Sequence, residues 1–290
     1  MAAQVPMAHH MHNGRWIRMV ARDEGVQGRV VVVTGGGTGI GAAIAERFAD
    51  DGATVAVLGR RRGPIEEVAA RIGGIAITAD ASEAASARAA VQEVVSRFGR
   101  LDVLVANAGG HGFSAVGDTS DADWQAAITV NLSTAFVVAR EALPALEADG
   151  GGEIVVISSL AGLFAGPSVA GYTVGKHALI GLTKSLARDY SRRGVRVNAI
   201  CPGWVRTPMA DAEMDEFASH AREIGDRAAG YAAVTSDVPL GRPGEPEEIA
   251  AITRFLGSRQ SSYMTGAVLV ADGGAHIVDL PTLAFEHAGM

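Results

Sequence analysis

A regular alternation of short β-branched runs with longer helical patterns constrains this sequence more than any other feature, and it begins at Arg29. Strands that alternate with crossover helices form parallel sheets covered by helices on both faces. The sequence therefore predicts an α/β fold of the Rossmann type, with a doubly wound parallel seven-stranded sheet. The predicted strands are Val30–Val33, Thr54–Leu58, Ile75–Thr78, Leu101–Val105, Ile154–Ile157, Val195–Ile200 and Ala267–Val270.

Five segments between these strands have the length and periodicity of crossover helices. Gly52 is expected to stop the first, and Ser82 is expected to cap the second. One stretch, residues 208–239, does not fit the alternation, and a loop of this length in a compact domain is typical of a functional lid. The predicted helices are Ile40–Asp50, Ser82–Phe98, Ala122–Leu146, Tyr172–Ser191 and Pro246–Leu256.

The alternation divides the chain into three parts. Residues 1–27 contain three histidines and three arginines without the apolar core of a secretory signal, so they are predicted to be a flexible extension. Residues 28–274 are predicted to form one domain, because no Pro/Ser-rich linker or internal repeat interrupts them. Residues 275–290 remain as a C-terminal tail.

Charge and cysteine content narrow the possible partners. The 25 Lys and Arg against 32 Asp and Glu leave a net charge of -7, which disfavours binding to nucleic acid or to an anionic membrane. No apolar run reaches the roughly 18 residues of a membrane span. One cysteine, Cys201, allows no internal disulfide, which suits the cytoplasm. No metal site is expected, because His9, His10 and His12 are interpreted as part of a loose tail.

A glycine-rich turn joins the first predicted strand to the first predicted helix. It reads Thr34-Gly-Gly-Gly-Thr-Gly-Ile-Gly41. Glycines in this position let the backbone approach a pyrophosphate, whose charge is stabilised by the N-terminus of the helix. An ordinary glycine turn is the alternative, but the strand-turn-helix context favours a dinucleotide site. The residues assigned to that site are Gly35, Gly37, Thr38, Gly39, Ile40 and Gly41.

The end of the second strand bears on the choice of cofactor. An acid there would hold the ribose 2′-hydroxyl of NAD, whereas this sequence has Gly59 followed by Arg60, Arg61 and Arg62. Guanidinium groups suit the 2′-phosphate of NADP. The sequence therefore predicts NADP(H) as the preferred cofactor, with Arg60 and Arg61 in contact with it and NAD(H) as a possibility. A solvated basic turn is the alternative.

Polar residues at later strand ends point to catalytic chemistry. Ser159 follows the fifth strand, and Lys176 lies four residues after Tyr172, on the same face of a helix. Lowering a tyrosine pKa from about 10 to about 7 requires roughly 4 kcal/mol, which one ammonium about 4 Å away can supply. Ser159 would then hold a substrate oxygen while Tyr172 transfers its proton.

Taken together, these motifs resemble those of the single-domain branch of the short-chain dehydrogenase/reductase family, over residues 28–274. The glycine turn resembles the family's TGxxxGxG motif, and Asn107-Ala108-Gly109 resembles its NAG motif. Ser159 with the Tyr172-to-Lys176 spacing resembles its Ser and YxxxK residues, and Pro202-Gly203 its PG motif. Within the family, the sequence resembles in a general way the 3-oxoacyl-[acyl-carrier-protein] reductase-like oxidoreductases.

The resemblance implies a role for each matching residue. Ser159 would polarise the carbonyl, Tyr172 would be the general acid or base, and Lys176 would lower the pKa of Tyr172 and hold the nicotinamide ribose. Asn131 would position a water for proton relay to Lys176. Further cofactor contacts are implied for Asp80, Ala81, Asn107, Ala108, Gly109, Tyr172, Lys176, Pro202, Gly203, Val205 and Thr207. Thr38 departs from those NADP-dependent members that carry a second basic residue in the turn.

The combined interpretation is an NAD(P)-dependent oxidoreductase that interconverts a ketone and a secondary alcohol, with NADPH-dependent carbonyl reduction favoured. One alternative is an NAD-dependent dehydrogenase of a sugar, steroid or cyclic alcohol. Another, from a different class, is a non-catalytic NADP-sensing or scaffold protein, although Tyr172 and Lys176 are both present. A serine hydrolase is disfavoured because no G-x-S-x-G elbow occurs.

The lid and the tail carry the remaining expectations. Apolar lid residues would close over an apolar substrate, whereas nearby acids make a long anionic carrier a poor fit. The resemblance also implies a homotetramer, onto which the tail could dock through Leu280, Leu283 and Phe285. The apolar lid residues are Met209, Met214, Phe217 and Tyr231, and the acids are Asp211, Glu213, Asp215 and Glu216.

Overall fold

A seven-stranded parallel sheet forms the centre of the protein, in the order β5-β4-β3-β6-β7-β8-β9. The computed structural model describes residues 8–12, 15–19, 25–110, 112, 114–148, 150–221 and 224–290. The strands are β3 (Val30–Thr34), β4 (Thr54–Gly59), β5 (Ile75–Thr78), β6 (Val103–Ala106), β7 (Glu153–Ile157), β8 (Arg196–Pro202) and β9 (Val268–Ala271). All seven predicted strands are confirmed, and the fold is the predicted doubly wound Rossmann type.

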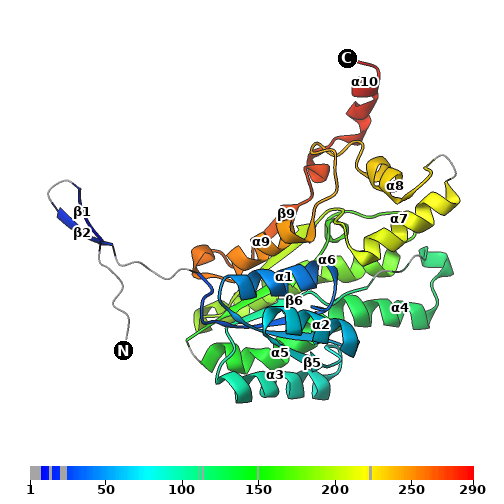
Figure 1. Ribbon diagram of the computed structural model, residues 1–290. Coiled ribbons are helices and arrows are strands. Elements are labelled where there is room, and N and C mark those ends of the chain that lie inside the picture. Colours follow the sequence, from blue (N-terminus) through cyan, green and yellow to red (C-terminus); the bar gives the residue numbers. More distant parts are fainter. Residues whose placement is uncertain are drawn as a thin grey trace.

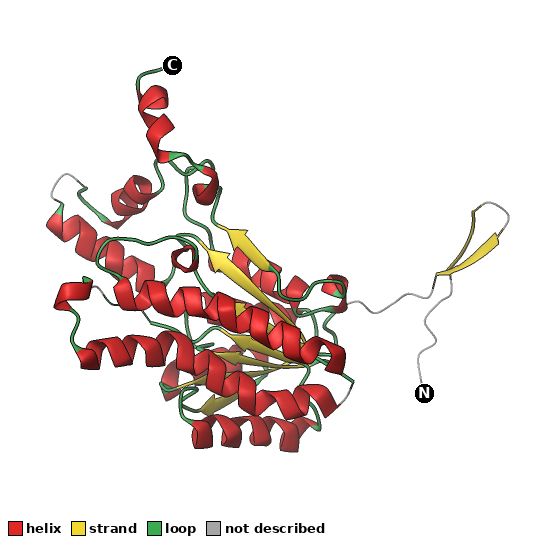
Figure 2. Ribbon diagram, turned by 180° about the vertical axis from the view of Figure 1, so that it is seen from behind, coloured by secondary structure: helices red, strands yellow, loops and turns green. Residues whose placement is uncertain are grey.

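Helices cover both faces of this sheet (Figures 1 and 2). Side chains of β3 alternate between the faces: Val30 and Val32 pack with the core on one side, and Val31 and Val33 with the core on the other. The first core includes side chains of α3 (Ala84–Phe98), α5 (Thr134–Ala148) and α6 (Ala170–Tyr190). The second includes side chains of α1 (Gly39–Asp50), α2 (Arg62–Ile72) and α9 (Pro246–Leu256).

Three predictions about the helices are wrong in detail. Helix α2 was not predicted; it begins at Arg62, the last residue of the basic run, and its C-cap is Gly73, which has a left-handed φ of 63°. Ser82 is not the N-cap of α3, because Glu83 occupies that position and Ser82 bonds to Asp80 instead. The helix predicted at Ala122–Leu146 is divided into α4 (Asp121–Ile128), a π-helical turn η2 (Thr129–Ser133) and α5.

The lid consists of two helices rather than a loop, which corrects the prediction for residues 208–239. Thr207 caps α7 (Pro208–His220) by accepting a hydrogen bond from Ala210 N, and Asp226 caps α8 (Arg227–Val234) in the same way through Ala229 N. The two helices pack around a small separate core of Ala210, Met214 and Tyr231. Because these side chains bury one another, most of the apolar residues of the lid stabilise the packing of α7 against α8.

Both terminal segments contain secondary structure that was not predicted. Strands β1 (Ala8–His12) and β2 (Arg15–Met19) pair as an antiparallel hairpin within the predicted flexible segment, whose residues 1–7, 13–14 and 20–24 lie outside the described part. Val26 is completely buried in the core, so the domain starts before residue 28. The C-terminal tail carries helix α10 (Leu283–His287), which projects from the body in Figure 1.

Short 3-10 helices complete the connections. They are η1 (Val116–Asp118), η3 (Leu160–Gly162), η4 (Ser191–Arg193), η5 (Arg259–Ser261), η6 (Ala275–Ile277) and η7 (Leu280–Thr282). By length and composition alone, the continuous helical segment Asp121–Ala148 could cross a membrane. Core helices of soluble proteins meet the same criteria, and α5 contributes eight buried residues to the domain.

A buried ion network lies at the N-terminal edge of the sheet. Glu153, the first residue of β7, pairs with Arg29 and with Arg196, whose Nη2 lies 2.9 Å from Glu153 Oε1. Arg196 also donates hydrogen bonds to the carbonyls of Ser258 and Ser261. The network therefore ties the starts of β7 and β8 to the turn after α9, at the edge of the sheet opposite the C-terminal strand ends.

Candidate active site

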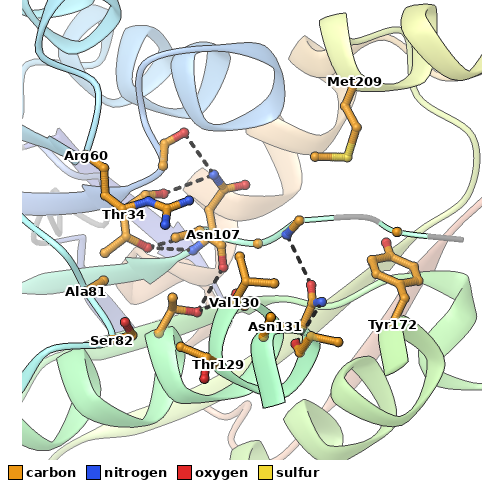
Figure 3. Close-up of a pocket in the computed structure, with 18 of the residues that line it drawn as sticks. Thr34, Arg60, Ala81, Ser82, Asn107, Thr129, Val130, Asn131, Tyr172 and Met209 are labelled. Carbon is orange, nitrogen blue, oxygen red and sulfur yellow. Dashed lines mark hydrogen bonds between the residues drawn. The ribbon is translucent and has the colours of Figure 1, made fainter. Parts of the chain in front are cut away.

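A cavity of about 1410 Å³ lies beyond the C-terminal ends of the strands. The chain leaves β3 toward β4 and β5 on one side and later returns to β6 on the other, which creates the topological switch point at which Rossmann folds bind ligands. Figure 3 shows Thr34, Arg60, Asn107 and Tyr172 around this cavity. Strand-end residues from across the sheet therefore meet in one place, as the sequence predicted.

Most residues assigned to the site line this cavity. Ser159, Pro202, Gly203 and Val205 do not: Ser159 reaches the site through Tyr172, and Val205 is buried beside Gly244 in a short parallel bridge. The assigned residues that line the cavity are Gly35, Gly37, Thr38, Gly39, Ile40, Gly41, Arg60, Arg61, Asp80, Ala81, Asn107, Ala108, Gly109, Asn131, Tyr172, Lys176 and Thr207.

The glycine turn brings the N-terminus of α1 to the cavity. Gly35 and Gly39 have left-handed φ values of 64° and 54°. A Cβ on Gly41 would lie 2.3 Å from the Gly35 carbonyl oxygen, so the turn closes only without a side chain there. The first turn of α1 contains no acid, and its N–H groups are available to an anion.

Thr34 fastens the turn to the neighbouring strand. Its Oγ1 accepts hydrogen bonds from the N–H groups of Asn107 and Ala108, both at 3.0 Å. In return, Asn107 Nδ2 donates to the carbonyls of Thr34 and Gly35, as Figure 3 shows. The NAG segment is therefore a structural clamp for the glycine turn. Its partner Thr34 was not among the residues predicted for the site, although it opens the same motif.

The cavity is basic where β4 ends. Arg60 and Arg61 line it and are exposed, whereas Arg62 turns away to pair with Glu66 at 2.7 Å. Asp80 also lines this end; a hydrogen bond from the Ser82 hydroxyl, with a smaller contribution from the charge of Arg60, lowers its pKa. Asp80 is therefore held in its ionised form by its own turn.

The π-helical turn η2 presents Asn131 to the site. Asn131 Oδ1 accepts a hydrogen bond from Gly110 N at 3.2 Å, and its Nδ2 donates to the Ala127 carbonyl at 3.1 Å. A Cβ on Gly175 would lie 2.7 Å from the Asn131 Cβ, so this glycine lets α6 approach the turn closely. The close approach places Asn131 beside the part of α6 that carries Tyr172 and Lys176.

Tyr172 and Lys176 lie together as the spacing predicted, but their electrostatic relation differs from the prediction. Lys176 Nζ lies 5.6 Å from the centre of the Tyr172 ring and donates a hydrogen bond to the Ile157 carbonyl at 3.1 Å. Burial raises the pKa of Tyr172; its hydrogen bond with Ser159 lowers the pKa, and the charge of Glu213 raises it further. Without a bound cofactor, Lys176 does not produce the expected low tyrosine pKa.

Burial also acts on Lys176 itself. The residue is 5% exposed, and burial lowers the pKa of its ammonium to about 8. A lysine near its titration point can change charge at modest cost when a partner arrives. The pair is therefore in a state in which both side chains are mostly protonated near neutral pH.

Ser168 is a site residue for which the sequence offered no distinct signal. It lines the cavity with a left-handed φ of 52°, a conformation that strains a residue other than glycine. The strand-like bridge between Ser114 and Val169, and the 2.7 Å bond from Ser114 N to the Ser168 carbonyl, hold it there. This loop forms the wall of the cavity immediately before Tyr172.

The residues present fit a nicotinamide dinucleotide. The side-chain-free turn at Gly35 and Gly41 and the N-terminus of α1 match a pyrophosphate, and the basic strand end suits the adenosine half. Lys176 and Tyr172 lie where the other half would reach. Among the described residues, no group of three or more His, Cys, Asp or Glu could hold a metal ion.

Comparisons with known proteins agree with this site. A family model described as "Enoyl-(Acyl carrier protein) reductase" matches residues 35–276. Protein MoaE of Klebsiella aerogenes is 45% identical over 258 residues, which cover 89% of this chain and 99% of that protein. The 3-oxoacyl-[acyl-carrier-protein] reductase FabG of Thermotoga maritima is 34% identical, over 86% of this chain and 98% of its own.

Solved structures place the chain in the same class. L-Sorbose reductase from Gluconobacter frateurii, solved with NADPH and L-sorbose, has a TM-score of 0.83 at 32% identity, covering 87% of this chain and 98% of its own. These matches and the site define an NAD(P)-dependent oxidoreductase that acts on a CH–OH group. The chain belongs to the short-chain dehydrogenase/reductase family.

Proposed function

We propose that this protein is an NADPH-dependent carbonyl reductase that converts a ketone to a secondary alcohol. The observation that carries this proposal is that Tyr172 and Lys176 lie together in the cavity bordered by the glycine turn. Burial raises the pKa of Tyr172, so its hydroxyl holds the proton that reduction must deliver to the substrate oxygen. Reduction needs a proton donor at the substrate oxygen, whereas oxidation would need a base.

Each side chain has a task in this proposal. The Ser159 hydroxyl holds the substrate oxygen by a hydrogen bond, and the Tyr172 hydroxyl donates its proton to that oxygen. Lys176 stabilises the phenolate that this transfer leaves behind and would hold the ribose of the cofactor. Asn131 would position a water that returns a proton toward Lys176. The dinucleotide, when bound, supplies the hydride to the carbonyl carbon.

We further propose that NADP(H) is preferred over NAD(H). Arg60 and Arg61 line the cavity directly after β4, where Gly59 leaves no acid to repel a 2′-phosphate. Residues that would hold the rest of the cofactor are the glycine turn, Asp80 and the NAG segment. The basic pair is the feature that supports this preference.

A spectrophotometric assay tests both proposals. NADPH and NADH are compared in parallel over a panel of 3-oxoacyl thioesters, cyclic and aromatic ketones, and keto sugars. We expect turnover with NADPH that Tyr172→Phe reduces about 10²- to 10⁴-fold, while NADPH binding is retained. A preference for NADH would contradict the role of Arg60, and undiminished turnover in the variant would contradict the role of Tyr172.

We also propose that the protein works in the cytoplasm as a homotetramer. Large apolar side chains are exposed on three helices of the body: Trp124 on α4, Phe136 on α5 and Val174 on α6. Exposed apolar residues of this size suit subunit contacts. Sedimentation velocity of the full chain and of Phe136→Glu checks this; a wild-type monomer would contradict the proposal.

A further inference from the structure

Ser168 has a backbone conformation that a glycine would adopt more easily. Its φ is 52°, and it is the one residue other than glycine with a positive φ in the part of the chain that the structure describes. A side chain in this region of φ strains the backbone, whereas glycine enters it without penalty. Strained residues of this kind cluster at binding and catalytic sites. The conformation of Ser168 therefore calls for an explanation from its side chain.

The loop itself uses only the backbone of Ser168. Its carbonyl accepts a 2.7 Å hydrogen bond from Ser114 N, and the bridge between Ser114 and Val169 continues this pairing. Within the described residues, the Ser168 hydroxyl has no hydrogen-bond partner. A glycine at this position would keep the backbone contacts and remove the strain. The packing of the loop therefore does not explain the hydroxyl.

Ser168 lies on the substrate side of the cavity. It lines the same cavity as Tyr172 and is exposed, so a ligand can reach it. Thr173 N donates a hydrogen bond to the Val169 carbonyl in the first turn of α6, so Ser168 directly precedes the turn that carries Tyr172. Figure 3 shows Tyr172 on the opposite side of the cavity from Arg60, which suits the adenosine half of the cofactor. A group bound to Ser168 would therefore belong to the substrate.

Other polar side chains of the lining are already engaged within the wall that precedes η2. The Thr119 hydroxyl is hydrogen-bonded to the Ser114 hydroxyl, with their oxygens 2.8 Å apart. Asp123 Oδ2 accepts a 2.7 Å hydrogen bond from the Ser120 hydroxyl. The Ser168 hydroxyl differs from these groups because its hydrogen-bonding capacity is left for a ligand.

The charges of the lining indicate what kind of group fits there. The described basic residues of the lining are Arg60 and Arg61 at the end of β4, and Lys176. In the wall that precedes η2, the charged lining residues are Asp118 and Asp123. An anionic group on the substrate would therefore face negative charge. A serine hydroxyl both donates and accepts a hydrogen bond, which matches an uncharged alcohol.

We propose that the Ser168 hydroxyl is a specificity-determining group, which forms a hydrogen bond with a hydroxyl that the substrate carries near the reacting carbonyl. The substrate class is then an uncharged hydroxyketone rather than a keto acid or a plain ketone. The strain at Ser168 is the cost of placing a hydroxyl where glycine would fit the backbone better. This inference rests on the proposed carbonyl reduction.

A matched substrate series tests the inference with NADPH and the full chain. The series consists of cyclohexanones that carry a hydroxyl or a methyl group at C2 or C3, together with the C3 carboxylate. For the wild type we expect the hydroxy compound to exceed its methyl partner about fivefold or more in kcat/KM, at C2 or at C3. The carboxylate should be the poorest substrate.

Two substitutions at position 168 separate the hydroxyl from the strain. Ser168→Gly and Ser168→Ala both remove the hydroxyl, but only Ser168→Gly relieves the backbone. In both variants the ratio of kcat/KM between the hydroxy and methyl ketones should fall to near one. The melting temperature of Ser168→Gly should be at or above that of the wild type, and that of Ser168→Ala should be lower than that of Ser168→Gly.

Ser120→Ala is the control. Ser120 lies outside the lining and caps α4 by accepting a 3.2 Å hydrogen bond from Asp123 N, so its loss should lower the melting temperature while the preference is kept. Equal kcat/KM for the hydroxy and methyl ketones in the wild type would overturn the inference. So would an undiminished preference in Ser168→Gly, or an equal loss of preference in Ser120→Ala.

The inference and the proposed function can fail separately. If the wild type reduced none of these ketones or those of the wider panel, carbonyl reduction would be wrong. Calorimetric titration of the hydroxy and methyl ketones into the NADP⁺-loaded protein would then decide the role of Ser168. Tighter binding of the hydroxy compound that is lost in Ser168→Gly supports the role, and indistinguishable binding refutes it.

Discussion

At the scale of single residues, the glycine turn is shaped by contacts that leave no room for a side chain. Gly41→Ala would place a Cβ 2.3 Å from the Gly35 oxygen and 2.5 Å from Asn107 Nδ2. We expect NADPH affinity to fall about tenfold or more and the free energy of unfolding to fall by about 1–3 kcal/mol, because the turn must open. Fluorescence titration and chemical denaturation measure the two effects.

A glycine in a roomier position provides the control. At Gly63, in the first turn of α2, nothing lies within 4 Å of the position that a methyl group would take, so Gly63→Ala should leave cofactor affinity unchanged. If both substitutions weakened NADPH binding equally, the steric argument for Gly41 would be wrong.

Lys176 links the site to pH-dependent stability. Its pKa is about 8 in the folded protein against an ordinary value of 10.5, so between these values the unfolded chain binds more protons and stability rises with pH. The shift corresponds to about 3 kcal/mol. Relative to Lys176→Met, the cofactor-free wild type should therefore gain up to about 3 kcal/mol between about pH 7 and about pH 10.

Chemical denaturation of both proteins across this range measures that difference, and other titrating groups cancel in the comparison. The lost hydrogen bond to the Ile157 carbonyl adds a contribution that does not vary with pH in this way. A difference that stayed constant across the range would show that the lysine is not desolvated as described.

At the scale of elements, strands were easier to predict than helices, for a physical reason. The central strands β3, β6 and β7 are buried along their whole length, so their sequences are nearly continuous apolar runs. Helix α2 begins in a basic run that was interpreted only as a cofactor turn, although Pro64 in its first turn is a helix-start signal. Thr207-Pro208 and Asp226 gave similar signals for the lid helices.

A substitution in the small core of the lid should disrupt the packing of α7 against α8 without disturbing the rest of the domain. Tyr231 is 1% exposed, packs in the lid core, and lies 4.8 Å below the Arg206 guanidinium. Tyr231→Ala should raise KM for the ketone on the order of tenfold and leave NADPH affinity nearly unchanged, because the glycine turn and the main core are intact.

Steady-state kinetics and cofactor titration check this separation. Tyr231→Phe keeps the packing and loses only the hydrogen bond to Asp211, so its KM should lie between those of the wild type and Tyr231→Ala. A comparable loss of NADPH affinity and ketone binding in Tyr231→Ala would mean that the helix pair also supports the cofactor site.

At the scale of the whole molecule, the ion network of Glu153 and the candidate active site lie at opposite ends of the strands. Glu153 is 6% exposed between Arg29 and Arg196. Glu153→Gln should lower the free energy of unfolding by about 3 kcal/mol, because Arg29 and Arg196, whose side chains are each 14% exposed, lose the carboxylate that they share. Values of kcat and KM at a temperature where the variant is folded should be unchanged, since the cavity lies beyond the other strand ends.

An exposed ion pair serves as the comparison. Glu66→Gln breaks the contact with Arg62 on the surface of α2, where solvent screens both charges, so stability should change little. Thermal and chemical unfolding of the two variants, run beside activity assays, distinguishes the cases. Loss of kcat in Glu153→Gln at such a temperature would contradict the proposed separation.

The candidate site was predictable where it depends on strand ends and helix spacing. Topology brings the glycine turn, the NAG segment and Tyr172 to one crevice, and sequence order determines that topology. Two features depend on the folded environment instead. These are the raised pKa of Tyr172 and the strain at Ser168.

The π-helical turn Thr129–Ser133 has one more consequence, for insertions and deletions. A π turn holds one residue more than an α turn, so deletion of a single residue there could restore a regular helix and improve its hydrogen bonding. The repaired helix would rotate the residues on one side of the deletion by about 100° relative to those on the other. Asn131 would then point away from the site, or the buried face of α5 would point away from the core. The extra residue in the π-helical turn is therefore needed to orient both correctly.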